Sequence, residues 1–171
     1  MKKTVIVING SGGVGKDTLC DMAAKHYKVY NVSSITPIKN VAKMCGWNGE
    51  KDDRSRKFLS DLKRLTVEYN DFPTKWLMNE YKTFAESEDE IMFVHIREPE
   101  EIEKFVKACD GMVKSLLVSC GERFDKVHRA PYGNSSDDGV EKYPYDYKFC
   151  NDKPLEQTEK SFIEFLKKNI L

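Results

Sequence analysis

The chain lacks long hydrophobic runs, a surplus of charge of either sign, and internal repeats. Its apolar runs, such as residues 91–94, are far too short to cross a bilayer. Lysine plus arginine and aspartate plus glutamate number 28 each, so no overall field attracts nucleic acid or an anionic membrane. We therefore expect neither a membrane nor polymeric nucleic acid as a partner, and any site for an anion must be local.

Paired cysteines are missing as well. The cysteines are odd in number, scattered, and without any Cys-x-x-Cys pair; they are Cys20, Cys45, Cys109, Cys120 and Cys150. This pattern argues against a zinc site and against disulfides, and it favours small buried side chains in a reducing compartment. The short apolar stretch at residues 5–8 is predicted to be a first strand and not a signal peptide. With the cysteine pattern, this leads us to expect a cytoplasmic protein. We expect it to be a monomer or a homodimer.

Along all 171 residues, the chain contains segments whose apolar residues recur at strand spacing in alternation with segments where they recur at helix spacing. Short apolar runs predict strands at 4–9, 29–33, 91–96, 115–119 and 146–149. Such alternation predicts an α/β fold of three layers, in which about five parallel strands are flanked by helices. At this length we expect a single domain over residues 1–171.

Two of the predicted helices carry apolar residues at helical spacing over a long stretch. The helix at 55–69 is expected to bury Phe58, Leu62, Leu65 and Tyr69. The last helix, at 154–171, is expected to bury Leu155, Phe162, Phe165 and Leu166. By contrast, residues 121–145 show little periodicity and much polarity, which predicts an irregular segment.

A glycine-rich loop joins the strand at 4–9 to the helix that begins near residue 17. It reads Gly10, Ser11, Gly12, Gly13, Val14, Gly15, Lys16, Asp17 and Thr18. This matches the Gly-x-x-x-x-Gly-Lys pattern of P-loops, between the required strand and helix. Glycines let amide groups turn inward around a phosphate, and the following helix adds unpaired amides and the positive end of its dipole. Lys16 adds a full positive charge near the β- and γ-phosphates, so the loop predicts a nucleoside-triphosphate site.

One position departs from the P-loop pattern. Asp17 follows Lys16, where serine or threonine is usual, and Thr18 comes one residue later. We expect Thr18 to bring its hydroxyl to Mg²⁺, directly or through water. Asp17 either lies near the same ion or only favours the amino terminus of the helix.

The Gly-Lys-Asp-Thr run at 15–18 resembles the loops of nucleoside and deoxynucleoside monophosphate kinases, which have an adenylate kinase-like fold. Three further stretches are similar, in their order, to the phage deoxynucleotide monophosphate kinase branch; they are 35–39, 96–102 and 145–152. The resemblance implies Mg²⁺-dependent transfer of the γ-phosphoryl group of ATP to a nucleoside or deoxynucleoside monophosphate. It also implies an acceptor-binding region at about 36–69 and a lid-like region at about 121–145.

The resemblance also implies a catalytic arginine. Arg97 comes just after the strand at 91–96, and ligands bind at the carboxyl ends of strands in open α/β sheets. Its planar guanidinium suits phosphate oxygens that move during transfer. We expect it to act together with Lys16. The alternative is a structural ion pair with a neighbouring carboxylate, namely Glu98, Glu100 or Glu101.

Other residues are assigned by the same resemblance. Arg123 and Arg129, in the lid-like region, are expected to be catalytic, because a mobile arginine can stabilise transferred charge on closure. The acceptor-binding candidates are Lys39, Arg54, Arg56, Lys57 and Arg64, for which a solvated charged face is an equally good explanation. Asn151 and Lys153 follow the last predicted strand and are candidates for the adenine pocket.

His95 stands where many P-loop enzymes hold an acidic residue that orders Mg²⁺. Imidazole is a poor partner for Mg²⁺. Either Asp17 or Glu98 substitutes, or the metal site is weaker, or His95 is simply hydrogen-bonded at the end of a strand. Two functional alternatives follow: a kinase for another phosphorylated or hydroxylated metabolite, and a nucleotide-binding protein with little turnover. A GTPase is disfavoured, because residues 151–153 have the types of a guanine-reading motif in the wrong order.

Overall fold

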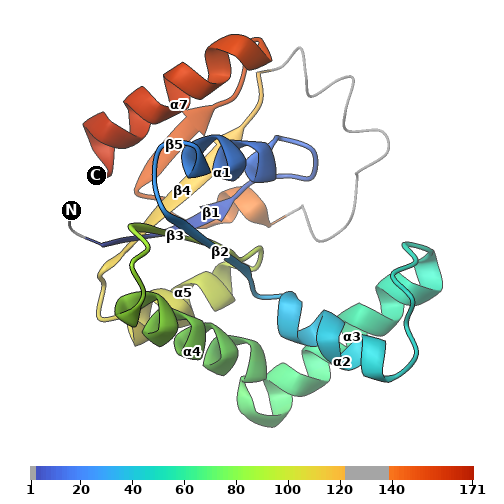
Figure 1. Cartoon of the computed structure of the whole chain (residues 1–171). Coiled ribbons are helices and arrows are strands. Elements are labelled where there is room, and N and C mark those ends of the chain that lie inside the picture. The colour runs from blue at the N-terminus through green and yellow to red at the C-terminus, as the bar shows by residue number, and fades with distance from the viewer. Residues whose placement is uncertain (1–2, 122–138) are drawn as a thin grey trace.

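A computed structural model describes residues 3–121 and 139–171 of the chain. Within these residues, five parallel strands form one sheet in the order β2-β3-β1-β4-β5 (Figure 1). The strands are β1 (Thr4–Asn9), β2 (Val29–Ser33), β3 (Ile91–His95), β4 (Val113–Ser119) and β5 (Tyr147–Cys150). The predicted α/β fold with about five parallel strands is confirmed, with strand ends that differ by at most about two residues.

Helices cover both faces of this sheet. They are α1 (Lys16–Ala24), α2 (Thr36–Met44), α3 (Asp53–Asn70), α4 (Phe72–Glu86), α5 (Pro99–Ala108) and α7 (Leu155–Asn169), with a 3-10 turn η2 (Val140–Lys142). α1 and α7 lie on one face, α4 and α5 lie on the other, and α2 and α3 extend away from the sheet (Figure 1). In the described part of the chain, no helix combines the length and the apolar character that crossing a membrane requires.

The strand residues divide between two apolar layers. Ile6 and Ile8 of β1 pack with α1 and α7, whereas Val5 and Val7 pack with α4 and α5. The division follows from the period of two along a strand, and a strand buried on both faces reads as a continuous apolar run. Because β1 is held from both sides, the loop that follows it starts from a rigid support.

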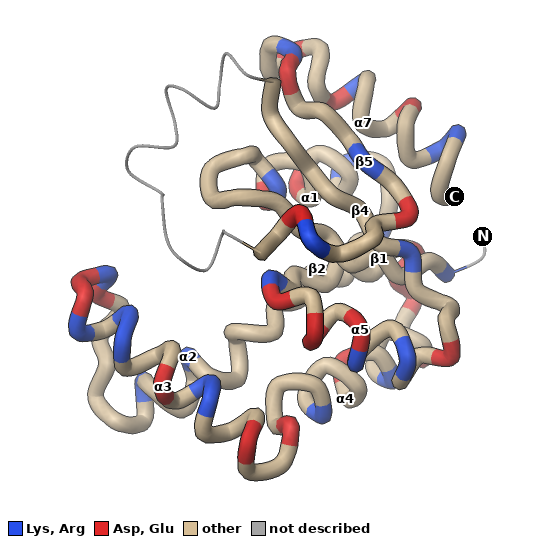
Figure 2. The backbone as a smooth tube through the Cα atoms, turned by 180° about the vertical axis from the view of Figure 1, so that it is seen from behind, with Lys and Arg blue, Asp and Glu red and all other residues tan. Residues whose placement is uncertain are grey.

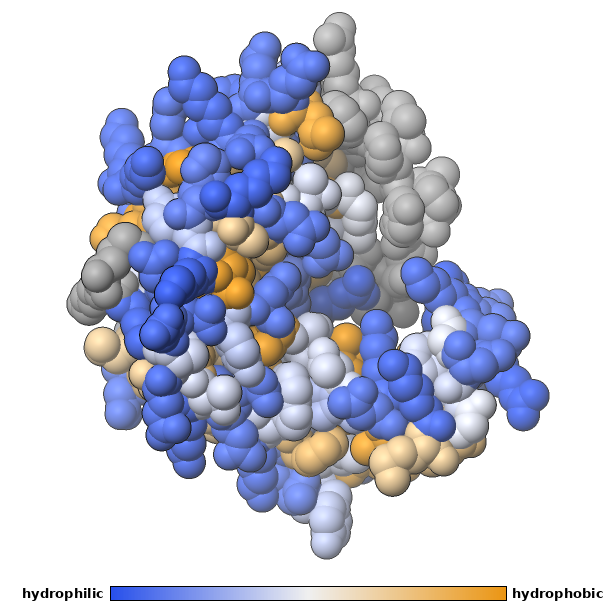
Figure 3. All heavy atoms as spheres, viewed as in Figure 1, coloured by the Kyte–Doolittle hydropathy of each residue, from blue (hydrophilic) through white to orange (hydrophobic). Residues whose placement is uncertain are grey.

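Two predictions about buried stripes are wrong in part. Phe58, Leu65 and Tyr69 of α3 are exposed, Tyr69 to 86%. The reason is that α3 packs beside α2 and α4 in the region that extends away from the sheet, and Figure 3 shows apolar atoms on the surface of this outer region. Leu155 is 69% exposed because it lies in the first turn of α7, ahead of the buried part of the helix at Phe162.

Candidate functional site

The chain leaves two neighbouring strands in opposite directions at the carboxyl edge of the sheet. α1 follows β1 to one face, and α5 follows β3 to the other. Ligands of open α/β sheets bind at such a switch point. Because Ile8 pairs with His95, the glycine-rich loop, His95 and Arg97 all follow the same edge. The structure thus brings the glycine-rich loop to the same edge as His95 and Arg97, which lie far along the sequence from it.

Gly10 and Gly15 occupy positions that a larger residue would not fit. A Cβ atom at Gly10 would lie 2.3 Å from the carbonyl oxygen of Val118 in β4. Gly15 is the N-cap of α1 with a φ of +89°, and a Cβ atom there would lie 2.8 Å from Nδ2 of Asn151. A φ in this range is costly for residues with a side chain. The loop is therefore a tight turn held against the carboxyl ends of β4 and β5.

The amino end of α1 and Lys16 supply positive charge at this loop. Among the described residues no side chain caps α1, and the first amides of a helix have no partner within the helix. The ammonium of Lys16 donates hydrogen bonds to the carbonyl oxygens of Gly10 and Ser11, at 2.5 and 3.0 Å. A cation folded back over a turn of amides is an arrangement that suits a polyphosphate.

A buried asparagine, which the sequence analysis did not single out, ties the loop to Arg97. Asn9 is 1% exposed. Its Oδ1 accepts from the amide of Gly10 at 2.8 Å, and its Nδ2 donates to the carbonyl oxygen of Arg97 and to the hydroxyl oxygen of Tyr145. Tyr145 donates to the carbonyl oxygen of Val140 at 2.7 Å, and burial raises the pKa of Tyr145 to about 12. Asn9 thereby joins the ends of β1 and β3 to the segment before β5.

Asn151 braces the loop from the other side. Its Nδ2 donates to the carbonyl oxygen of Val14 at 3.0 Å, and its amide donates to the carbonyl oxygen of Ser119 at 2.7 Å. Lys153 is exposed and donates to the hydroxyl of Ser161 at 3.1 Å. The contacts with adenine that the resemblance implies for Asn151 and Lys153 stay predictions.

The candidate metal ligands lie in the first turn of α1. Asp17 and Thr18 are both exposed there. Oδ1 of Asp17 lies 3.9 Å from Nδ1 of His95, and burial lowers the pKa of His95, an effect that the Asp17 carboxylate only partly offsets. Glu98, the other predicted substitute for an acidic residue at this position, binds Lys63 instead. Asp17 is therefore the carboxylate that the structure places beside His95.

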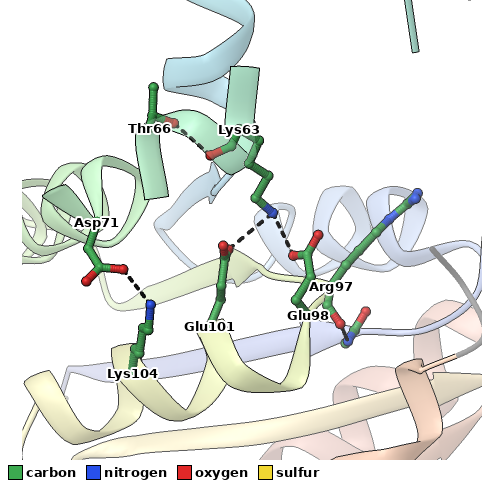
Figure 4. Close-up of polar contacts among 8 residues, drawn as sticks. Lys63, Thr66, Asp71, Arg97, Glu98, Glu101 and Lys104 are labelled. Carbon is green, nitrogen blue, oxygen red and sulfur yellow. Dashed lines mark hydrogen bonds and ion pairs between the residues drawn. The ribbon is translucent and has the colours of Figure 1, made fainter. Parts of the chain in front are cut away.

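Arg97 points away from two of the carboxylates that were its alternative partners (Figure 4). Glu98 and Glu101 both bind the ammonium of Lys63, at 2.6 and 3.1 Å. Lys63 belongs to α3, and its side chain is only 13% exposed. Burial raises the pKa of Glu101, and the neighbouring ammonium partly offsets that effect. The two glutamates at the start of α5 thus anchor α3, a link that no local sequence pattern indicates.

The predicted acceptor-binding residues belong to the outer region formed by α2 and α3. Arg56, Lys57 and Arg64 each pair with an acidic residue about one turn away on α3. Lys39 is exposed on α2. Figure 2 shows basic and acidic residues interleaved along this region. These contacts fit a solvated charged face, so the role in acceptor binding stays a prediction.

Arg54 differs from these four residues because it borders a hollow. The hollow has a volume of about 420 Å³ and lies between the end of α2 and the start of α3. Trp47 and Phe58 also line it. The two remaining candidates, Arg123 and Arg129, lie outside the described residues.

No family model and no curated protein matches the chain. The tunicamycin resistance protein of Deinococcus radiodurans aligns with 96% of this chain and 96% of its own, at 12% identity and a TM-score of 0.58. A shikimate kinase from Bacteroides thetaiotaomicron aligns with 96% of each chain at 17% identity and a TM-score of 0.52. A sugar kinase from a Janibacter species aligns with 98% of this chain and 95% of its own, at 15% identity and a TM-score of 0.51. At these identities the likenesses show the fold alone, which this chain shares with the shikimate kinase and the sugar kinase.

Proposed function

We propose that the protein is an Mg²⁺- and ATP-dependent kinase that phosphorylates a nucleoside or deoxynucleoside monophosphate. The observation that carries the proposal is the tight glycine turn after β1, with Lys16 folded over it and the uncapped amino end of α1 behind it. Its position at the switch point of a parallel sheet is where such folds bind ligands. In this proposal the protein is a single domain that binds a small-molecule nucleotide substrate. It acts in the cytoplasm as a monomer or homodimer.

The loop from Gly10 to Thr18 binds the polyphosphate of ATP in this proposal. Amides of the turn and of the first turn of α1 hold phosphate oxygens, and the ammonium of Lys16 leaves its carbonyl partners for the β- and γ-phosphates. Asp17 and Thr18 offer the oxygen donors that Mg²⁺ prefers and would hold the ion. Bound there, Mg²⁺ neutralises part of the phosphate charge.

Transfer breaks the bond between the γ-phosphorus and the β–γ bridging oxygen and forms a bond to an oxygen of the acceptor phosphate. ADP leaves with the electron pair of the broken bond. In this proposal Lys16 and Arg97 stabilise the charge that spreads over the γ-phosphoryl oxygens, because cations held at the bound phosphates need little rearrangement during transfer. Arg123 and Arg129 would add charge when the lid-like region at 121–145 closes.

The acceptor is proposed to bind the outer region at 36–69. The positive charge of this outer region comes from Lys39, Arg54, Arg56, Lys57 and Arg64. In the same proposal the adenine of ATP is bordered by Asn151 and Lys153. Support comes from the two tethers of this region to α5: Lys63 binds Glu98 and Glu101, and Lys104 binds Asp71 at 2.5 Å. In this proposal the two tethers set the distance between the acceptor region and Arg97.

The test is ADP formation from Mg²⁺ and ATP with a panel of acceptors. The panel contains ribo- and deoxyribonucleoside monophosphates and, because two similar folds are a shikimate kinase and a sugar kinase, shikimate and common sugars. The proposal expects ADP well above the water control with at least one monophosphate, and loss of that ADP in Lys16→Ala. ADP formed only with a hydroxylated metabolite would contradict the acceptor class. Tight ATP binding with no acceptor-dependent ADP would indicate a binding protein instead.

A further inference from the structure

His95 faces Asp17 across the start of α1, directly beside the glycine-rich loop. Nδ1 of His95 lies 3.9 Å from Oδ1 of Asp17. Nε2 of the same ring lies 2.9 Å from Oδ1 of Asn31 on β2. The imidazole, at the end of β3, thus lies between the middle of β2 and the helix that follows the loop.

The contact with Asn31 decides which ring nitrogen carries the proton. A carbonyl oxygen only accepts hydrogen bonds, so in the neutral ring Nε2 of His95 is the donor and Nδ1 keeps its lone pair. Nδ1 and the Asp17 carboxylate then face each other as two acceptors, and a cation or a hydrogen-bond donor between them would satisfy both.

The surroundings limit what that occupant can be. The thiol of Cys20 lies 3.8 Å from Nε2, and burial raises its pKa far above the usual range, so no thiolate takes part. The carboxylate of Asp17 is 93% exposed and free to turn toward a ligand. Among the described residues no three His, Cys, Asp or Glu side chains form a metal cluster. An ion at this place would therefore take its other ligands from the hydroxyl of Thr18, from water or from a bound phosphate.

We propose that Nδ1 of His95 and the carboxylate of Asp17 together bind the divalent ion that accompanies the nucleotide. A histidine that donates its second ring N–H to a carbonyl oxygen is the usual arrangement of a metal ligand. One nitrogen donor also changes the selectivity, because Mg²⁺ prefers oxygen, whereas Mn²⁺ and Co²⁺ also accept imidazole. The site is therefore expected to bind these transition-metal ions more tightly than the Mg²⁺ of the proposed reaction. This inference rests on the proposed function, since nucleotide phosphates complete the coordination.

The direct test is the electron spin echo spectrum of Mn²⁺ bound to the full-length protein with ADP. Nitrogen-14 modulation from a coordinated imidazole is expected in the wild type. Calorimetry with ADP and either Mn²⁺ or Mg²⁺ gives the second readout, and the expected result is tighter binding with Mn²⁺.

Variants identify the nitrogen. His95→Gln should abolish the nitrogen modulation and reduce the preference for Mn²⁺. Asn31→Ala should weaken Mn²⁺ binding in the presence of ADP by roughly tenfold, the low end of the range for lost second-shell partners. His26→Gln is the matched control, because His26 is exposed and pairs with Glu159, and it should leave both readouts unchanged.

The outcomes separate this inference from the proposed function. ADP binding with Mn²⁺ but without nitrogen modulation in the wild type overturns the inference and leaves the kinase proposal standing. Absence of ADP binding with either ion contradicts the kinase proposal, and the metal site falls with it. The wild-type spectrum decides the matter even if His95→Gln does not fold.

Discussion

Gly15 shows at the scale of one residue how the loop depends on backbone conformation and on a neighbour. Its φ of +89° and the short approach to Asn151 both disfavour a side chain. Gly46 has a similar φ of +93°, and a Cβ atom there would have open space around it. The two glycines therefore separate the cost of the backbone conformation from the cost of the contact.

We predict that Gly46→Ala lowers the free energy of unfolding by about 1 kcal/mol, the usual cost of this backbone region. Gly15→Ala should cost about 1 kcal/mol more, because Asn151 must turn away and lose its hydrogen bond to Val14. Only Gly15→Ala should also weaken ADP binding. Urea unfolding and calorimetry measure the two effects, and equal unfolding costs for the two variants would contradict the account.

The pH dependence of stability is a second prediction at this scale. The pKa of His95 is lowered in the folded protein, so the unfolded chain binds the proton more readily. Stability therefore falls as pH falls from about 6.5, the unperturbed value, toward the lower folded pKa. Urea unfolding in buffer with a chelator should show this loss in wild type and in His26→Gln but not in His95→Gln. A loss of equal size in all three proteins would show that His95 is not its cause.

At the scale of elements, the tethers between α3 and α5 are what place the outer region. Lys63 binds two carboxylates at the start of α5, and Lys104 binds Asp71 between α3 and α4 (Figure 4). By comparison, Lys57 makes an exposed pair within α3. Removing one partner of an ion pair that is largely shielded from solvent leaves the other charge uncompensated and lowers the free energy of unfolding. Exposed ion pairs contribute little to that free energy.

We predict that Lys63→Met lowers the free energy of unfolding by about 1–3 kcal/mol, less than for a fully buried group because Glu98 is half exposed. Lys57→Met, the matched control, should stay within about 0.5 kcal/mol of wild type. Chemical denaturation of the two variants is the measurement. An effect of Lys57→Met as large as that of Lys63→Met would refute the tether.

The sequence predicted what depends on local pattern and missed what depends on distant contacts. The glycine-rich loop and the parallel sheet could be predicted because turns and strands depend mainly on the pattern of neighbouring residues. The exposure of Tyr69 was predicted wrongly, since burial depends on which layer a helix meets. Asn9 with Tyr145, and Lys63 with Glu98, join residues 136 and 35 positions apart, so no spacing rule reveals them.

At the scale of the whole molecule, a rigid sheet carries a loosely packed outer region. Within α3, which is described along its whole length, Ser55 is the one buried residue, and it is still 9% exposed. The strands β1 and β3, by contrast, lie at the centre of both apolar layers. Local opening is easiest where few apolar contacts form.

We predict that amides of α2 and the first half of α3 exchange with deuterium much faster than amides of β1 and β3. A bound acceptor monophosphate should slow exchange in the outer region, since it adds contacts there. Hydrogen-exchange mass spectrometry with and without the monophosphates of the acceptor panel provides the comparison. Equal protection of α3 and β1 in the free protein would argue against a separately moving acceptor region.

The central claim is that the loop after β1 binds a polyphosphate through its amides and Lys16. Calorimetric titration of ADP into wild type, Lys16→Ala and Lys25→Ala tests it most directly, because Lys25 is an exposed lysine just after α1 that pairs with Glu159. The account predicts saturable binding by wild type and Lys25→Ala, and a loss of at least about tenfold, or about 1.4 kcal/mol, in Lys16→Ala. Equal affinity of Lys16→Ala and wild type, or no binding by wild type, would contradict it.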